Sequence, residues 1–414
     1  MSLIEKIKAF LKRIWRFWYH SVLEVLRRIT PERVKKIILK ILYRRERKII
    51  VQNQEILRHI LKEKHSGKDY RMIIVFPPSL DWDVQLFQRP QQLAIALAKQ
   101  GALVFYVQPK PDRKQQPFQL IRERLYLCPV HVDTFQILPD ALIYLLTWNS
   151  NYASRFNHPR ILYDYVDDIN AFYGDHQKIV KGHQYLLNNA SYILATARKL
   201  VDEVRLHRTD VIFSPNGVVY EHFARAARRE FSSPPSDMQA ILSKSIPIIG
   251  YYGALARWFD YELLKSIAIL RPEYQFVLIG PDFDGTLELS GIPKDRNIYW
   301  LGVKSYEELP HYLQYFDVAI IPFVVNEITH ATSPLKLFEY MAGEKPIVIT
   351  PMQESMRYSG VLVGENSVQF TQQLDFALKL REDEAYLSHL RQTALENTWE
   401  QRAEEILSAT NREH

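Results

Sequence analysis

The chain has 414 residues, of which 47% are hydrophobic, so it can form two substantial hydrophobic cores. Residues 1–50 hold 15 Lys and Arg against 4 Asp and Glu, whereas the other 364 residues hold 38 against 43, so the formal charge of +6 comes from the N-terminal segment. The main body therefore lacks the broad basic surface of a nucleic-acid-binding protein, and a single cysteine, Cys128, excludes an internal disulfide. We expect Cys128 to be a buried core residue in a reducing compartment.

Residues 1–66 are predicted to form a basic helical arm. Apolar residues recur at helical spacing with Lys and Arg between them, and Thr30 and Pro31 are predicted to cap and begin a second helix. No uncharged apolar run of about 18 residues is present, so no transmembrane helix is expected. Basic residues also interrupt any signal-peptide core: Lys6, Lys8, Lys12, Arg13 and Arg16.

Two interpretations of this arm remain open. In the first, Trp15, Phe17 and Trp18 lie at the depth of lipid headgroups while the cations contact anionic lipid, which makes the chain a peripheral membrane protein. In the second, the arm packs on its own main body or on a second copy of the chain in a homodimer. Nucleic-acid binding is the least favoured, and we expect no nucleic-acid partner.

Residues 67–225 are predicted to form a first domain of alternating strands and helices. A strand at 72–76, a helix at 89–100 and a strand at 102–107 make a βαβ unit, which is typical of a parallel sheet covered by helices. Gly101 suits the position after the helix. Further strands are expected at 141–147, 160–166, 191–196 and 210–217.

A second domain of the same kind is predicted at residues 226–398. The segment 224–246, which contains "SSPPS", is predicted to link the two domains. Strands are expected at 246–253, 275–280, 298–302, 318–323 and 346–350, with helices at 261–270 and 306–316. Residues 399–414 are predicted to form a helix that crosses back to the first domain. The fold class is thus α/β, with two Rossmann-like doubly wound domains that face a cleft.

The stretch "TSPLKLFEYMAGEKPIV" places a short helix between two of these strands. Ser333 is predicted to be its N-cap and Pro334 its first residue, which leaves the amides of Leu335 and Lys336 free at the helix start. Such a helix start binds anions, and the Lys336 ammonium adds a full positive charge. Glu339, one turn further on, is placed to accept hydrogen bonds from two sugar hydroxyls. The alternative is an ordinary surface pair of Lys336 and Glu339.

This stretch resembles the donor-nucleotide motif of the retaining GT-B glycosyltransferases of group 1, also called family 4. Similar agreement is found in "FSPNGVVYEHF", "LGVKSYEELPHYLQYFDVAIIPF" and "WEQRAEEIL". "FQRPQQLA", "YDYVDD" and "YYGALARWFDYELL" resemble a teichuronic-acid-type branch of that class. The resemblance covers about residues 70–410. It implies the GT-B fold and a nucleotide diphosphate sugar as the donor substrate.

By this resemblance, Glu339 holds the ribose, and Lys336 with the amides of Ser333 and Leu335 holds the diphosphate. Gly302, Val303 and Lys304 border the base, and Ser305 and Glu308 form a capping box for the next helix. The remaining donor-site residues implied are Pro334, Thr332, His330 and Gly253.

The sequence departs from the family pattern in two places. The first glutamate of the family motif, expected at the donor sugar, falls on Ala331, and Glu327 is the candidate replacement. The Arg and Lys of the loop after the first strand of the second domain fall on Ala254 and Phe259. Arg257 in the same loop and Arg89 from the first domain are the candidate cations for the diphosphate.

For the reaction, fixed cations and a helix dipole are expected to stabilise the departing diphosphate without a metal or another cofactor. The acidic triplets "DWD" (81–83) and "DFD" (282–284) resemble metal-binding sequences but are common in loops. Asp164, Asp167 and Asp168 follow a predicted strand, and one of them could orient or deprotonate an acceptor hydroxyl. A capping or turn role for each is the alternative.

The sequence therefore predicts a retaining, hexosyltransferase-like glycosyltransferase at the cytoplasmic face of the cell membrane. Its acceptor is expected to be a saccharide or a lipid-linked glycan. The alternatives are a nucleotide-sugar epimerase on the same fold and a catalytically silent GT-B scaffold in a membrane complex.

Overall fold

The structure is a computed structural model that describes residues 32–67, 69–84, 87–112, 114–138, 140–172, 174–292 and 297–411. The chain divides into two compact units, one ending at Lys64 and the other beginning at His65. In the first unit, helix α3 spans Glu32–Lys64. The predictions for residues 1–31, including the cap at Thr30 and the membrane-facing aromatic residues, lie outside the described residues.

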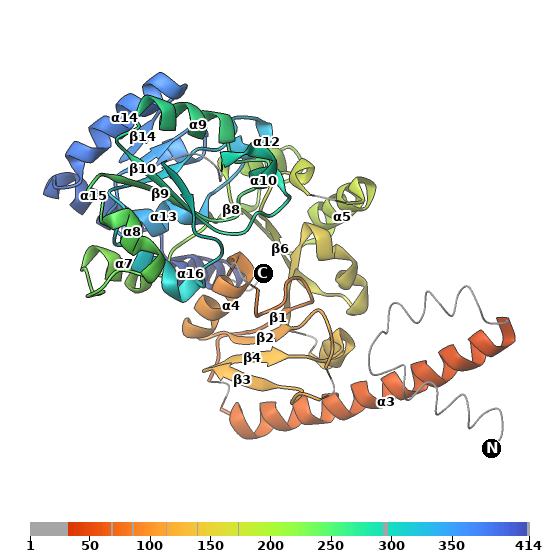
Figure 1. The fold of residues 1–414 in the computed structure, drawn as a ribbon. Coiled ribbons are helices and arrows are strands. Elements are labelled where there is room, and N and C mark those ends of the chain that lie inside the picture. The colour runs from red at the N-terminus through yellow and green to blue at the C-terminus, as the bar shows by residue number, and fades with distance from the viewer. Residues whose placement is uncertain are drawn as a thin grey trace, which may run out of the picture. The chain divides into compact units, whose positions relative to one another are not determined.

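The second unit contains two sheets, each covered by helices (Figure 1). The first sheet has eight strands in the order β3-β4-β2-β1-β5-β6-β7-β8, and only the β3–β4 pair is antiparallel. Its strands are β1 (Ile73–Phe76), β2 (Leu103–Val107), β3 (Gln119–Arg122), β4 (Leu125–Cys128), β5 (Leu142–Leu146), β6 (Arg160–Tyr165), β7 (Tyr192–Ala195) and β8 (Val211–Phe213). Its helices are α4 (Arg89–Lys99), α5 (His176–Asn189) and α6 (Arg198–Arg205).

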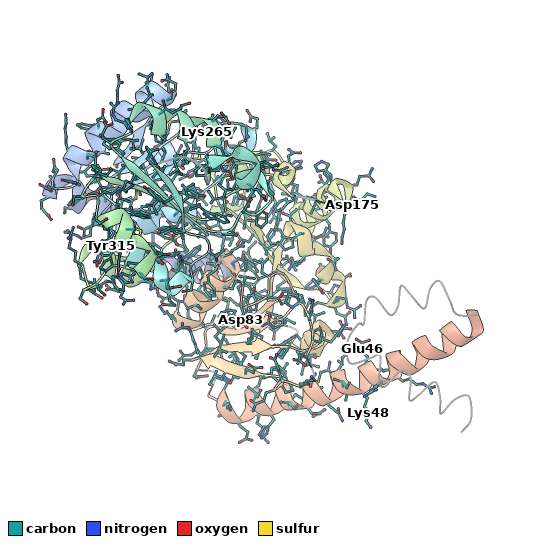
Figure 2. All side chains as sticks on the ribbon, viewed as in Figure 1. Glu46, Lys48, Asp83, Asp175, Lys265 and Tyr315 are labelled. Carbon is teal, nitrogen blue, oxygen red and sulfur yellow. The ribbon has the colours of Figure 1, made fainter. Side chains whose placement is uncertain are left out.

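Local sequence explains why these elements begin and end where they do. Four strands of the first sheet, β2, β4, β5 and β7, are almost wholly buried and rich in Leu, Ile and Val, as expected for a parallel sheet covered on both faces. Gly101 follows α4 with φ +94°, a left-handed conformation that ends the helix. Asp175 caps α5 by accepting a hydrogen bond from the amide of Lys178 and is exposed on the surface (Figure 2).

The second sheet has six parallel strands in the order β11-β10-β9-β12-β13-β14. They are β9 (Ile248–Tyr252), β10 (Gln275–Ile279), β11 (Ile298–Trp300), β12 (Val318–Ile321), β13 (Ile347–Ile349) and β14 (Val361–Val363). The helices of this half are α7 (Tyr220–Ala227), α8 (Gln239–Leu242), α9 (Tyr261–Leu270), α10 (Thr286–Ser290), α11 (Leu309–Leu313), α12 (Glu327–His330), α13 (Leu335–Ala342), α14 (Ser367–Leu380) and α15 (Glu384–Leu395). Two doubly wound sheets confirm the predicted fold class.

The last helix, α16 (Trp399–Thr410), returns to the first domain and packs beside α4 (Figure 1). Trp399 is buried among the core residues of the first sheet. Two ion pairs hold the outer face of α16, one between Arg71 and Glu404 and one between Lys99 and Glu400. The chain therefore crosses between the domains twice.

Three features differ from the sequence-based expectation. The hairpin of β3 and β4 and the edge strand β14 were not predicted, because short strands at sheet edges carry little periodic signal. The segment 224–246 is not an extended linker, since it contains α8 and the end of α7. Phe223, expected at the end of the first domain, is buried in the core of the second sheet. The first crossing therefore follows β8 directly.

Candidate active site

A cavity of about 330 Å³ lies between the two sheets, with most of its wall in the second domain. Phe87 and Gln88 reach it from the first domain. The other lining residues are Tyr252, Gly253, Ala254, Trp258, Ile279, Gly280, Phe283, Lys304, Tyr306, Leu309, Leu335, Lys336 and Glu339. The loops after β9 and β10 and the start of α13 meet here, at the carboxyl ends of parallel strands, which is the usual place for ligands in such sheets.

Helix α13 begins one residue later than expected. Pro334 is the N-cap and Leu335 the first helical residue, and no side chain caps the helix. Ser333 is instead bound to the first domain. Its hydroxyl accepts a hydrogen bond from the backbone amide of Asn216 (3.3 Å), and its carbonyl accepts one from the Asn216 side chain. The capping roles predicted for Ser333 and Pro334 were therefore wrong, but the first two helical residues, Leu335 and Lys336, do line the cavity.

Glu339 and Lys336 share the cavity wall without forming a direct ion pair among the described residues. Glu339 is 8% exposed and Lys336 is half-buried, so they are not an ordinary surface pair. Burial raises the pKa of Glu339 to about 7, and the Lys336 ammonium opposes that rise. Burial lowers the pKa of Lys336 to about 8, and the Glu339 carboxylate opposes that fall. An anionic ligand beside Lys336 would stabilise its charged form.

Glycines let the backbone approach the lysine closely. Gly253 follows β9 with φ +141°, and a Cβ there would lie 2.7 Å from Cε of Lys336. Gly280 has φ +139°, and a Cβ there would lie 1.9 Å from the Gly253 carbonyl oxygen. The ammonium also lies 5.1 Å from the ring centre of Phe323 and 5.5 Å from that of Tyr251. These contacts hold Lys336 in one place, with its charged end at the cavity.

The residues predicted to border the base lie next to the cavity. The Gly302 carbonyl accepts a hydrogen bond from the Gly280 amide (2.8 Å), and Val303 is 39% exposed. Lys304 lines the cavity, while its ammonium pairs with Asp237 at 2.6 Å.

The capping box predicted after this segment is confirmed. The carboxylate of Glu308 accepts hydrogen bonds from the backbone amide and the hydroxyl of Ser305.

Arg89 and Asp164 form a buried pair inside the first domain, not a catalytic pair at the cavity. The guanidinium Nε lies 2.7 Å from one carboxylate oxygen of Asp164, and Nη2 lies 3.0 Å from the other. The remaining contacts of the guanidinium are the Ser214 hydroxyl, the Pro215 carbonyl and the Asn216 side-chain oxygen. Arg89 is 4% exposed and Asp164 is 0% exposed. The predicted contact of Arg89 with the diphosphate is therefore replaced by a structural role, because every side of its guanidinium is engaged.

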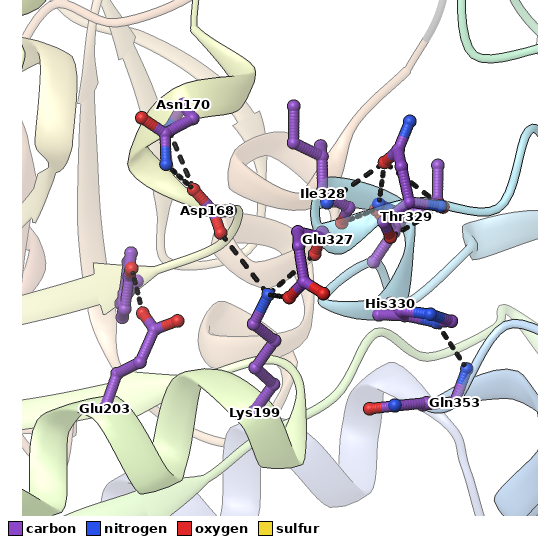
Figure 3. Close-up of polar contacts among 12 residues, drawn as sticks. Asp168, Asn170, Lys199, Glu203, Glu327, Ile328, Thr329, His330 and Gln353 are labelled. Carbon is purple, nitrogen blue, oxygen red and sulfur yellow. Dashed lines mark hydrogen bonds and ion pairs between the residues drawn. The ribbon is translucent and has the colours of Figure 1, made fainter.

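Figure 3 shows how Asp168 and Glu327 meet the same lysine. The ammonium of Lys199, from α6, lies 2.6 Å from the Glu327 carboxylate of the second domain and 3.8 Å from the Asp168 carboxylate of the first. Asp168 also accepts a hydrogen bond from the Asn170 amide (2.8 Å) and so caps a 3₁₀ turn. Glu327 thus bridges the domains and does not line the cavity, contrary to its expected role at the donor sugar.

His330, Thr332 and Arg257 do not line this cavity either. The His330 ring nitrogen accepts a hydrogen bond from the Gln353 amide (Figure 3), and the Thr332 hydroxyl donates to the Ile328 carbonyl. Arg257 is exposed, and its guanidinium donates to the Ala171 carbonyl of the first domain at 3.3 Å. Its guanidinium therefore contacts the first domain and does not line the cavity.

The "DFD" triplet has a structural role. The Asp284 carboxylate accepts hydrogen bonds from the amide and hydroxyl of Thr286, and the Asp282 carboxylate accepts them from the amides of Leu287 and Glu288. Both carboxylates therefore fix the start of α10. Among the described residues, no group of three His, Cys, Asp or Glu side chains is placed to hold a metal ion.

Sequence reasoning missed two tyrosines of the cavity wall. Tyr252, the last residue of β9, is 2% exposed, and Tyr306 follows β11. Both phenolic oxygens are buried; Glu339 is the polar neighbour of the Tyr252 hydroxyl, and Gln92 of the first domain is that of the Tyr306 hydroxyl. The sequence showed Tyr252 near the end of a predicted strand and Tyr306 at the start of a predicted helix, and both positions also suit core residues.

None of the described helices has a stretch long and apolar enough to cross a bilayer.

Comparison with known proteins agrees with this geometry. Residues 246–379 match the family described as "Glycosyl transferases group 1", a range that contains β9 to β14 and the Lys336–Glu339 segment. The chain is 26% identical over 190 residues to the putative teichuronic acid biosynthesis glycosyltransferase TuaH of Bacillus subtilis (strain 168). That alignment covers 44% of this chain and 46% of the relative, so less than half of each protein is matched.

Solved structures extend the similarity in fold to most of the chain. The sucrose-phosphate synthase of Thermosynechococcus elongatus superposes with a TM-score of 0.61 at 15% identity, covering 82% of this chain and 98% of that one. HepE of Anabaena, in complex with UDP and glucose, superposes with a TM-score of 0.57 at 14% identity, covering 81% and 99%. Both comparisons show that the fold of the two domains resembles that of solved two-domain proteins.

Proposed function

We propose that this chain is a retaining glycosyltransferase of group 1, which transfers a sugar from a nucleotide diphosphate sugar to a hydroxyl acceptor; the family match over residues 246–379 and the GT-B fold support the proposal. The observation that carries the proposal is that a cation, Lys336, and a buried carboxylate, Glu339, line one cavity near the start of α13. Lys336 and the first amides of the helix suit a diphosphate, and Glu339 suits a sugar diol one turn away. The cavity of about 330 Å³ suits a ligand of nucleotide size.

The charge on the departing nucleoside diphosphate is stabilised by Lys336 and the α13 dipole. The loop after β9 contributes little charge, because Ala254 lines the cavity at the position of the family arginine and Phe259 is 1% exposed. Lys304 is the other cation in the wall, although Asp237 already neutralises it in part. Lys336 is therefore the main side chain that stabilises the negative charge of the departing nucleoside diphosphate. No metal is required for this role.

UDP is the first nucleotide to test. HepE of Anabaena, which has the same fold, was solved with UDP and glucose. A thermal-shift panel of UDP, GDP, ADP and dTDP with their sugars identifies the nucleotide that this cavity accepts. A rise in melting temperature with nucleotides of one base, and loss of that rise in Glu339→Ala, supports the proposal. Absence of any shift across the panel contradicts it and favours a silent scaffold, the alternative that the residues at Ala254, Phe259 and Ala331 support.

We propose Asp167 as the group that orients the acceptor hydroxyl. It follows β6, is half-buried, and forms no hydrogen bond or ion pair with a described residue. Asp164 is occupied by Arg89, and Asp168 by Lys199 and the 3₁₀ turn, which leaves Asp167 as the available carboxylate of the three. Burial, followed by the Asp168 carboxylate, raises the pKa of Asp167 to about 7, whereas Arg89 opposes the rise. A carboxylate with such a pKa can accept a proton near neutral pH.

The acceptor is proposed to be a saccharide or a lipid-linked glycan at the inner face of the cell membrane, since residues 1–50 carry a net charge of +11. TuaH, the similar B. subtilis protein, is described as a teichuronic acid biosynthesis enzyme. Flotation with vesicles of 30% anionic lipid tests the location, using the full chain and a variant with Trp15, Phe17 and Trp18 replaced by Ser. Equal flotation of both proteins would exclude an aromatic membrane anchor.

A further inference from the structure

Two aromatic rings form an accessible part of the cavity wall. Trp258, from the loop after β9, and Phe283, from the loop after β10, both line the cavity, and their ring centres lie 5.9 Å apart at an interplanar angle of 43°. Phe283 is 56% exposed, whereas Glu339 in the same wall is 8% exposed. The rings therefore lie at the mouth of the cavity, where a ligand can cover them.

Backbone hydrogen bonds hold the two loops that carry these rings. The Leu255 carbonyl accepts a hydrogen bond from the Phe283 amide (2.8 Å), and the Leu255 amide donates to the Pro281 carbonyl (2.9 Å). The Trp258 carbonyl accepts a hydrogen bond from the Val324 amide (2.8 Å), which fixes the first loop to the loop after β12. The backbone that carries the rings is thus in place before a ligand binds, which reduces the entropy lost on binding.

Lys336 separates two parts of the cavity wall. Glu339, three residues further along α13, marks the part proposed to hold the ribose. The loop of Trp258 marks the other part, since it is bound to the loop after β12 and the Lys336 ammonium lies 5.1 Å from the ring centre of Phe323 in that same loop. In a nucleotide sugar, the diphosphate joins the ribose to the sugar. With its ribose at Glu339 and its diphosphate at Lys336, the donor therefore directs its sugar towards Trp258 and Phe283.

Resting on the proposed nucleotide-sugar site, we propose that Trp258 and Phe283 hold the sugar of the donor by packing against one of its C–H faces. The C–H groups of a pyranose ring carry a small positive charge, and the faces of aromatic rings carry a small negative one, so the two attract each other. Ala254 lines the cavity in the same loop and adds another apolar side chain to this part of the wall. The rings thus bind the sugar while Lys336 holds the diphosphate.

The test compares each nucleoside diphosphate with its sugar form by calorimetry: UDP with UDP-glucose, GDP with GDP-mannose and ADP with ADP-glucose. For the pair that the wild-type protein binds best, we expect the Trp258→Leu/Phe283→Ser double variant to raise the dissociation constant of the sugar form about threefold to tenfold. The dissociation constant of the diphosphate alone should change less than about twofold. Phe283→Tyr, which keeps an aromatic ring, should bind both forms as the wild type does. Phe376→Ser is the matched control, because Phe376 is 48% exposed on α14 and does not line the cavity.

The outcomes separate this inference from the proposed function. Equal weakening of the diphosphate and its sugar form in the double variant shows that the rings contact the nucleotide part, which overturns the inference and leaves the donor site standing. Unchanged binding of both forms overturns it as well, because the rings then contact no part of the donor. A wild-type protein that binds a diphosphate but none of the three sugar forms also overturns it. If no nucleotide binds at all, the proposed donor site itself is wrong.

Melting temperatures of the variants, compared with that of the Phe376→Ser control, show whether the fold is kept. Trp258 also packs against the core of the second sheet, so the double variant is the one at risk. If it melts below the control, Phe283→Ser alone gives the same comparison, because Phe283 is exposed.

Discussion

Asn216 of the first domain holds Ser333 of the second domain through both its backbone and its side chain. The Asn216 amide donates to the Ser333 hydroxyl, and the Asn216 side chain donates to the Ser333 carbonyl. Arg89 in turn donates to the side-chain oxygen of Asn216 at 3.3 Å. Since α13 begins two residues after Ser333, the buried Arg89–Asp164 pair is linked through Asn216 to the helix start at the cavity wall.

We expect Asn216→Ala to weaken nucleotide binding without removing any group that touches the cavity. The variant keeps the backbone bond to the Ser333 hydroxyl but loses the side-chain bond to the Ser333 carbonyl and the one accepted from Arg89, each contributing about 1 kcal/mol. The dissociation constant of the best nucleoside diphosphate should therefore rise about fivefold to thirtyfold by calorimetry. Asn170→Ala is the control, because among the described residues Asn170 donates hydrogen bonds to Asp168 of its own domain. Equal affinities of wild type and Asn216→Ala would show that α13 is held without this contact.

Removal of the buried guanidinium should destabilise the first domain strongly. In Arg89→Met the Asp164 carboxylate remains buried without its partner, which costs about 3–5 kcal/mol in the free energy of unfolding. Urea unfolding monitored by circular dichroism measures the change. The double variant Arg89→Met/Asp164→Leu should recover most of the loss, since no buried charge remains. A single variant as stable as the wild type would refute the structural role given to Arg89.

Lys336→Met should weaken binding of the nucleoside diphosphate by about 1.5–3 kcal/mol, the range for hydrogen bonds to charged groups. Met keeps much of the apolar stem that packs beside Gly253 and Phe323, so the fold should be retained. Lys265→Met is the matched control, because Lys265 pairs with Glu262 on α9. Calorimetry with all three proteins gives the comparison. An affinity in Lys336→Met equal to that of the control would remove Lys336 from the site.

The pH dependence of nucleotide binding should follow the two shifted groups. Above pH 8, Lys336 of the free protein loses its proton and its charge, so affinity should fall as pH rises. Below pH 7, Glu339 gains a proton and can no longer accept two hydroxyls, so affinity should fall as pH drops. The strongest binding is therefore expected between pH 7 and 8.

Glu339→Gln should weaken binding at every pH but remove its decline between pH 7 and about 6, where the ligand phosphate itself begins to titrate. Calorimetry across this range compares the two proteins. If the affinity of Glu339→Gln falls with decreasing pH as steeply as that of the wild type, a group other than Glu339 causes the decline.

Glu327→Gln distinguishes a domain bridge from a contact with the donor sugar. Glu327 is exposed and pairs with Lys199, and exposed ion pairs contribute little to stability or binding. We therefore expect kcat/KM for the donor to change less than about threefold. Lys199→Gln, which removes the other partner, should behave alike. A loss of two orders of magnitude in Glu327→Gln alone would restore Glu327 as the substitute for the family glutamate that falls on Ala331.

Local sequence determined much of this protein. The alternation of buried strands with amphipathic helices predicted both doubly wound sheets, and the helix 261–270 was predicted with the bounds of α9. The spacing of Lys336 and Glu339 in one short helix after a buried strand placed both at the same cavity. The Ser305–Glu308 capping box was also predicted correctly. Each of these features depends on neighbours within a few residues, which periodicity and capping chemistry encode directly.

Only the tertiary structure decided which partner each polar group has. Arg89 and Asp164 are 75 positions apart, and Ser333 and Asn216 are 117 apart, so no local pattern could pair them. The sequence showed Tyr252 as an aromatic strand residue, and its place beside Glu339 became evident only when β9 and α13 met at one cavity. Secondary structure follows from short-range periodicity, whereas the environment of a buried polar atom depends on strands and loops that the fold brings together from distant parts of the chain.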